Sequence, residues 1–231
     1  MFPAHGDGRI GSIVLPKTKR IVVGIDVGGA RKGFHAVALD NGVYLDRKQT
    51  PSVRELTRWV RDEIGAQIVA IDSPCRWRSG KSVRAAEREL LEDGIRCFLT
   101  PTRREAVRNT TSFYQWMLRG AELFRALEKT HPLRHAGKTA GGKCSFETFP
   151  HAITWHLSGG EADATRKRPQ RLALLRRHGI CVAALTNMDW IDAALCALAA
   201  EMFAAGHVMH FYGNRRTGHI VVPVPSRTSR L

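Results

Sequence analysis

Two short apolar segments that each end in an aspartate constrain the fold of this chain more than any other feature. The first is IVVGIDVGG, residues 21–29, and the second is AQIVAID, residues 66–72. Short apolar runs rich in β-branched residues predict buried strands. Because an unpaired charge is costly to bury, we expect each aspartate to lie where its strand leaves the core, at the edge of the sheet.

The sequence between these two strands predicts how they are connected. GFHAVALDNGVYLDRKQT indicates two strands joined at Asn41-Gly42, a dipeptide typical of type I′ hairpins. Apolar residues then recur at helical spacing from Val53 to Ile64, and Gly65 ends that helix. A helical crossover of this kind makes the next strand parallel to the first. Three antiparallel strands, a helix and a parallel strand are the opening of an RNase-H-like α/β fold, a mixed sheet flanked by helices.

The rest of the chain predicts further helices and strands. Helices are expected near Val83–Asp93, Ser112–Lys129, Pro169–His178 and Met188–Ala205. The first two form a helical insertion, and the second carries an apolar stripe that begins at Phe113 and is assigned to the core. Strands are expected at KCSFETFP and, as a closing pair, near Val208–Tyr212 and His219–Val222. We expect one domain at 20–223, a flexible basic tail at 1–19 and a flexible tail at 224–231.

Composition narrows the class of partner and the compartment. The chain has 231 residues, a formal net charge of +15 and a pI near 10.4. Such a charge attracts polyanions, of which nucleic acid is the commonest, although an arginine-rich composition alone would give the same value. Five scattered cysteines without a Cys-x-x-Cys motif predict neither a disulfide framework nor a zinc ribbon. With no apolar run of membrane length and no signal peptide, we expect a cytoplasmic protein without membrane contact.

Four acidic residues stand where a strand ends or a helix starts, and they are Asp26, Asp72, Glu147 and Asp192. Open α/β sheets place their sites at the carboxyl ends of the strands, where neighbouring carboxylates repel each other unless a cation lies between them. Mg²⁺ and Mn²⁺ prefer such oxygen ligands. We therefore predict a two-metal site that hydrolyses phosphodiester bonds. In it, Asp26 bridges the ions, Asp72 and Glu147 each hold one, and Asp192 completes the second.

Each of these acids also has a structural interpretation. Asp26 would organise a turn before two glycines, Asp72 would form an Asx-turn, and Glu147 would pair with an arginine. Asp189 is interpreted as structural, because Thr186-x-x-Asp189 resembles a capping box. Four acids at the same edge of one sheet nevertheless favour the metal interpretation for the set.

Basic residues near the predicted strand ends are candidates for binding phosphate or nucleic acid. They are Arg31, Lys32, Arg76, Arg78, Lys81, Arg84 and Arg88. Glu87 shares a helical face with Arg84 and Arg88, and the alternative for this trio is a solvated ion-pair face. His151 could shuttle a proton beside Glu147, or it could be a helix-start residue with a satisfied hydrogen bond.

Five motifs resemble one known family. They are GIDVGGARKGFHAVAL, AIDSP, the Arg84-x-x-Glu87-Arg88 helix, FETFPHA and DWIDAALCALAA, and they resemble the domain-of-unknown-function family 429 from Ile21 to Pro223. That family is regarded as predicted RNase-H-like nucleases, so the resemblance implies metal-dependent phosphodiester cleavage. DWIDAALCALAA also resembles the last acidic pair of Holliday-junction resolvases, which would extend a catalytic role to Asp192 and Asp189.

Two other functions compete with the nuclease. GIDVGGARKG resembles the first phosphate loop of sugar kinases and actin-like ATPases, which would make the protein an ATP-binding phosphotransferase. However, Ala30 stands where a hydroxyl is expected, and no second glycine-rich phosphate loop is present. The third hypothesis is a non-catalytic, basic nucleic-acid-binding domain, whose affinity would persist in EDTA and fall steeply with salt.

Overall fold

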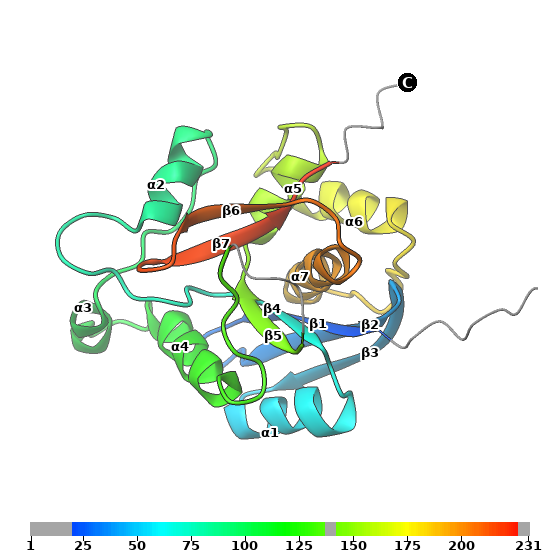
Figure 1. The fold of residues 1–231 in the computed structure, drawn as a ribbon, viewed down its shortest axis with the longest axis horizontal. Helices are drawn as coiled ribbons and strands as arrows, with labels where there is room; N and C mark the ends of the chain where they lie inside the picture. Colours follow the sequence, from blue (N-terminus) through cyan, green and yellow to red (C-terminus); the bar gives the residue numbers. More distant parts are fainter. Residues whose placement is uncertain (1–19, 137–141, 226–231) are drawn as a thin grey trace, which may run out of the picture.

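A computed structural model describes residues 20–136 and 142–225, so the tail predicted at 1–19 and most of that at 224–231 lie outside the described residues. Seven strands form one sheet in the order β3-β2-β1-β4-β5-β7-β6 (Figure 1). Their bounds are β1 Ile21–Val27, β2 Phe34–Asp40, β3 Val43–Thr50, β4 Ile68–Asp72, β5 Cys144–Glu147, β6 Met209–Asn214 and β7 Gly218–Pro223.

The directions of the strands confirm the predicted mixed sheet. β1, β2 and β3 pair antiparallel, β4 and β5 continue the sheet parallel to β1, and β6 and β7 close it as an antiparallel pair. Asn41 and Gly42 have φ angles of 49° and 81°, the left-handed values that a type I′ turn needs at both central positions. The order and directions of β3-β2-β1-β4-β5 are those of the RNase-H-like fold.

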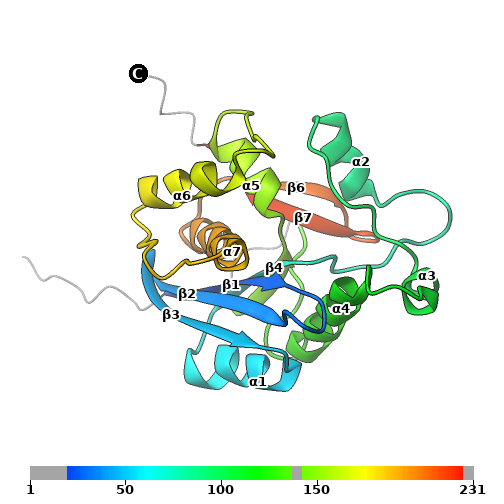
Figure 2. The same cartoon turned by 180° about the vertical axis from the view of Figure 1, so that it is seen from behind.

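Helices cover both faces of the sheet. Their bounds are α1 Val53–Arg58, η1 Trp59–Glu63, α2 Ala85–Glu92, α3 Arg103–Arg108, α4 Gln115–Leu127, α5 Pro150–Leu157, α6 Lys167–Arg177 and α7 Met188–Ala204. The long helix α7 crosses one face with α5 and α6 beside it, while α1 and α4 cover the opposite face (Figures 1 and 2).

Side chains of β1 alternate between the two faces of the sheet and so pack into both layers of the core. Val22 packs with the α7 side, and Val23 and Ile25 pack with the side of α1 and α4. Gly24 faces α7 at very short range, since a Cβ there would lie 1.9 Å from the backbone nitrogen of Ala197. This close approach packs the middle of α7, at Ala193–Ala197, directly against β1.

The structure departs from the sequence-based expectations in the helical insertion and after β5. Helix α3 was not predicted, and α5 was expected only in the alternative that makes His151 a helix-start residue; Pro150 at its first position is a favoured helix start. Helix α4 begins at Gln115, so Phe113 precedes it. The prediction that Phe113 belongs to the core is wrong, because the residue is 52% exposed. In the described part of the chain, the helices are too short or too polar to cross a bilayer.

Candidate active site

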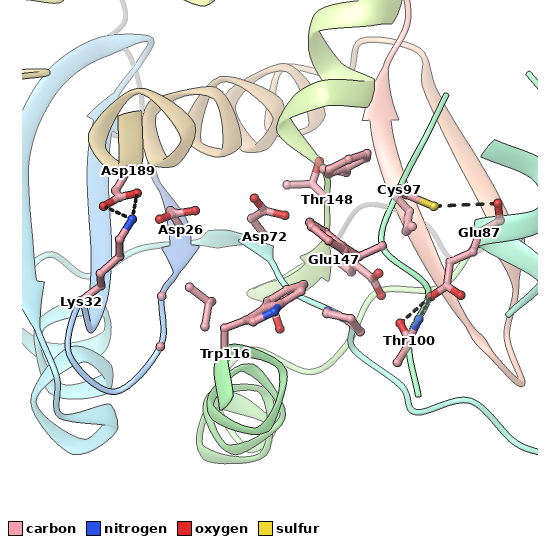
Figure 3. Close-up of a pocket in the computed structure, with 18 residues that line it drawn as sticks. Asp26, Lys32, Asp72, Glu87, Cys97, Thr100, Trp116, Glu147, Thr148 and Asp189 are labelled. Carbon is pink, nitrogen blue, oxygen red and sulfur yellow. Dashed lines mark hydrogen bonds and ion pairs between the residues drawn. The ribbon is translucent and has the colours of Figure 1, made fainter. Parts of the chain in front are cut away.

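Asp26 and Asp72 are direct neighbours in the parallel pair of β1 and β4 (Figure 3). Two residues earlier on each strand, Gly24 and Ala70 face α7, so by alternation both carboxylates also point to that side. Both line a pocket of about 360 Å³ at the carboxyl edge of the sheet. The structure therefore brings together the two strand-end aspartates that the sequence singled out.

Helix α7 adds two more carboxylates above this pair. Asp189 and Asp192 are three residues apart and share one face of the helix. Lys32 Nζ lies 3.1 Å and 3.2 Å from the two oxygens of Asp189. Arg171 of α6 donates a hydrogen bond to Asp192.

The capping-box interpretation of Asp189 is wrong. The N-cap of α7 is Asn187, whose side-chain oxygen accepts from the backbone nitrogen of Trp190 at 3.0 Å, and Thr186 lies one residue too early to cap. The carboxylate of Asp189 instead points into the pocket toward Lys32 (Figure 3).

Burial and mutual repulsion dominate the electrostatics of this cluster. Burial raises the pKa of Asp26 well above its ordinary value of 3.8, and the neighbouring carboxylates raise it further. The pKa of Asp72 is also raised by burial and by Asp192, against the opposing effect of Arg171. Within residues 20–136 and 142–225, neither Asp26 nor Asp72 takes part in an ion pair. A cation between them would relieve this repulsion.

His35 belongs to the same cluster and was missed by the sequence analysis. It lies directly opposite Asp26 in the β1–β2 pair, and a ring nitrogen of His35 and carboxylate oxygens of Asp26 and Asp189 all lie within 4.8 Å of one another. The residue is 2% exposed, and its Nδ1 has no hydrogen-bond partner within the described residues. Only the register of β2 against β1 would have identified His35, and the glycine-rich loop between these strands hides that register in the sequence.

Glu147 has a different environment from the one predicted. It pairs with Ile71, one residue before Asp72, and its neighbour Phe146 packs on the α7 side. A shift of one residue turns a strand side chain to the other face of the sheet, so Glu147 points away from α7. It still lines the pocket, to the right of Asp72 and slightly lower in Figure 3.

The carboxylate of Glu147 is occupied by Arg84. Nη1 and Nη2 of Arg84 donate to its two oxygens at 2.9 Å and 2.6 Å, and the backbone nitrogen of Cys75 donates at 2.8 Å. Glu87 supports this group from the helix, 3.5 Å from Arg84, and accepts from the backbone nitrogen of Thr100 at 3.1 Å. Arg84 is 1% exposed, so the structure places its charge against Glu147 and away from the surface where a phosphate would bind.

Of the seven predicted phosphate-binding residues, Lys32 alone lines the acidic pocket. Arg84 is buried as described, and Arg78 forms an ion pair with Glu105 at 2.6 Å. The residues that lie outside the acidic pocket, exposed or half-buried, are Arg31, Arg76, Arg78, Lys81 and Arg88.

A second pocket of about 590 Å³ adjoins the first and shares Asp72 with it. Its basic wall consists of Arg96, Lys167 and Arg171, none of which was singled out from the sequence. His151 also lines it, and burial lowers the pKa of that histidine, with Arg171 and Lys167 adding to the effect. His151 therefore shares this pocket with Asp72 and Asp192, and its lowered pKa favours the neutral form.

Comparisons with known proteins place this chain in a family. No curated protein matches the sequence. Among solved structures, T. thermophilus RuvC in complex with Holliday junction substrate matches with a TM-score of 0.43 and 15% identity, over 81% of this chain and 96% of that one. A likeness this weak says nothing of the substrate of this chain. The family described as "Protein of unknown function (DUF429)" matches residues 24–217, and the chain therefore belongs to that family.

Proposed function

We propose that this protein is a divalent-metal-dependent nuclease that hydrolyses phosphodiester bonds beside Asp26 and Asp72. The observation that carries the proposal is the position of these two carboxylates, adjacent in the sheet, turned into one pocket, and without an ion pair in the described ranges. Burial raises the pKa of both carboxylates, neighbouring carboxylates raise it further, and a divalent cation would offset both effects.

The surrounding side chains fit such a cation. Asp26 lies between Asp189 and Asp72 (Figure 3), where it could serve two ion positions. One position would use Asp26, Asp189 and His35, and the other Asp26, Asp72 and Asp192. Carboxylates suit Mg²⁺ and Mn²⁺, while an imidazole nitrogen favours a transition-metal ion, so we expect Mn²⁺ to bind more tightly than Mg²⁺. Such ions supply an activated water and stabilise charge on a phosphodiester.

The basic side chains around the acidic centre favour a polyanionic substrate. Arg96 and Lys167 are exposed on the wall of the adjoining pocket, next to Asp72. Lys32 lies at the opposite side of the cluster, beside Asp189. Phosphates on both sides of a scissile bond would meet positive charge while the bond itself lies over the carboxylates.

His151 has the position and protonation state for moving a proton. It shares the second pocket with Asp72 and Asp192, and its lowered pKa keeps it neutral at pH 7. A neutral imidazole can accept a proton from a water that attacks phosphorus. We propose this supporting role for His151.

The test is cleavage of labelled single-stranded, duplex, hybrid and branched DNA and RNA by the purified full chain with Mg²⁺ or Mn²⁺. We expect cleavage of at least one substrate, greater with Mn²⁺ and abolished by EDTA. Binding without cleavage under every condition would contradict the proposal and favour a non-catalytic binding domain. Cleavage that persists in EDTA would contradict the metal site.

A further inference from the structure

An aromatic cluster with two exposed and two half-buried rings borders the acidic pocket. We call Phe98, Phe113, Tyr114 and Trp116 the aromatic platform. The ring of Phe98 lies 5.9 Å from that of Phe113 and 6.4 Å from that of Trp116, in edge-to-face geometry, and Phe113 contacts Tyr114 at 4.9 Å. Phe98 is 65% exposed and Phe113 is 52% exposed. The exposed rings of Phe98 and Phe113 lose the stabilisation that burial would give them.

The platform connects the acidic pocket with two basic ones. Phe98 and Trp116 line the pocket of Asp26 and Asp72, and Phe98 also lines the adjoining pocket of Arg96, Lys167 and Arg171. On the other side, Tyr114 lines a pocket of about 670 Å³. The basic residues of that pocket are Arg78, Lys81, Arg104 and Arg108. Aromatic faces therefore lie next to the proposed reacting position, with positive charge on both sides.

The local structure explains why these rings are not buried. Helix α4 turns Met117, Leu123 and Leu127 into the core, whereas Phe113 lies before its first residue. Phe98 lies between α2 and α3, in a segment that belongs to neither a helix nor a strand. Trp116 packs partly against the core, and the exposed ring of Phe98 contacts the rings of Trp116 and Phe113.

We propose that the aromatic platform stacks unpaired nucleobases, so that the substrate is a single strand or carries an unpaired segment at the cleavage position. This inference rests on the proposed nuclease function and specifies its substrate class. Every base has a π-face that can stack on an aromatic ring, but in a duplex those faces are covered by neighbouring bases. Charge complementarity favours nucleic acid over a protein segment as the occupant. Arginines and lysines line the pockets on both sides of the rings, and the carboxylates are confined to the acidic pocket, where a phosphodiester bond would be cleaved.

The test measures equilibrium binding in EDTA, where the proposed metal-dependent cleavage cannot proceed. Fluorescence anisotropy would compare the full chain with Phe98→Ala, Phe98→Tyr and Phe113→Ala. The control is Val43→Ser, an exposed apolar residue of β3 outside these pockets. The probes are a labelled single strand, the same strand with abasic positions, and the corresponding duplex.

We expect Phe98→Ala to weaken single-strand binding about tenfold, whereas Phe98→Tyr and the control bind as the wild type does. Duplex affinity should not change, and abasic positions should abolish the difference between wild type and Phe98→Ala. Equal single-strand affinity of wild type, Phe98→Ala and Phe113→Ala would overturn the inference, as would an equal loss on duplex. If either result is found while the wild type still cleaves nucleic acid, only this inference fails. Absence of both binding and cleavage would also contradict the proposed nuclease function.

Discussion

The guanidinium of Arg84 binds both carboxylate oxygens of Glu147, at 2.9 Å and 2.6 Å, and both side chains are almost fully buried. This pair satisfies the acid that the sequence assigned to a metal ion. It leaves Asp26 and Asp72 as the neighbouring strand-end carboxylates without such a partner in the described ranges. Experiments can therefore distinguish the structural carboxylate of Glu147 from the proposed catalytic carboxylates of Asp26 and Asp72.

Substituting Glu147→Gln should lower the free energy of unfolding more than it lowers the affinity for Mn²⁺. Removing one partner of a buried ion pair leaves the other charge uncompensated, which costs about 3–5 kcal/mol. Urea unfolding measures this loss, and Glu105→Gln is the matched control, because Glu105 pairs with Arg78 at a more exposed position. A stable Glu147→Gln protein that no longer binds Mn²⁺ would show that Glu147 is a metal ligand after all.

Substituting Asp72→Asn should stabilise the metal-free protein at neutral pH. The folded pKa of Asp72 is raised by burial and by Asp192. As the pH rises past the ordinary value of 3.8, the unfolded chain loses its proton first, so wild-type stability falls until the folded pKa is passed. In EDTA we expect the wild-type melting temperature to decline over this range more than that of Asp72→Asn. Identical pH profiles would contradict the raised pKa of Asp72. Added Mn²⁺ should raise the melting temperature of the wild type more than that of Asp72→Asn, which keeps the group of Asp26, His35 and Asp189.

Substituting Lys32→Met should increase the affinity for Mn²⁺. Lys32 neutralises Asp189 in the metal-free protein, and a metal ion at Asp26, His35 and Asp189 would have to displace it. Exposed ion pairs contribute up to about 1 kcal/mol, so calorimetry should detect a gain of no more than about fivefold. Lys81→Met, a change at an exposed residue outside the acidic pocket, should leave the affinity unaltered. A loss of affinity in Lys32→Met would mean that no ion binds at Asp189.

Substituting Gly24→Ala should destabilise the fold and disturb the site together. The added methyl group would lie 1.9 Å from the backbone nitrogen of Ala197, and backbone atoms of α7 cannot yield as a flexible side chain would. Overpacking of this kind costs about 1–3 kcal/mol or more. Thermal unfolding should show the loss, and Gly65→Asn, at an open position with a φ of 68°, should cost less. Unchanged stability in Gly24→Ala would mean that α7 lies farther from β1 than described.

Periodicity and turn chemistry were sufficient to predict the first four strands of the sheet and their directions. The strands β1 to β4 follow from two apolar runs, the Asn41-Gly42 turn and one amphipathic helix, all of which are local signals. The expected adjacency of Asp26 and Asp72 is confirmed because parallel strands bring their carboxyl ends to the same edge.

The remaining details of the site depend on contacts between residues far apart in the sequence. His35 joins Asp26 through strand register, and Arg171 approaches Asp192 through the packing of α6 on α7. Glu147 was misplaced in the prediction because a one-residue offset between β4 and β5 turns it to the other face. Such an offset has no signature in a single sequence.

The most direct test of the central claim is cleavage of a labelled single strand with Mn²⁺ by the wild type, Asp26→Asn, Asp72→Asn and Asp62→Asn, with nucleic-acid binding measured on the same samples. Asp62 is an exposed acid of η1 outside the acidic pocket and serves as the matched control. We predict that the first two variants fold and bind nucleic acid but do not cleave it, whereas Asp62→Asn cleaves as the wild type does. Cleavage at the wild-type rate by Asp26→Asn or Asp72→Asn would contradict the account.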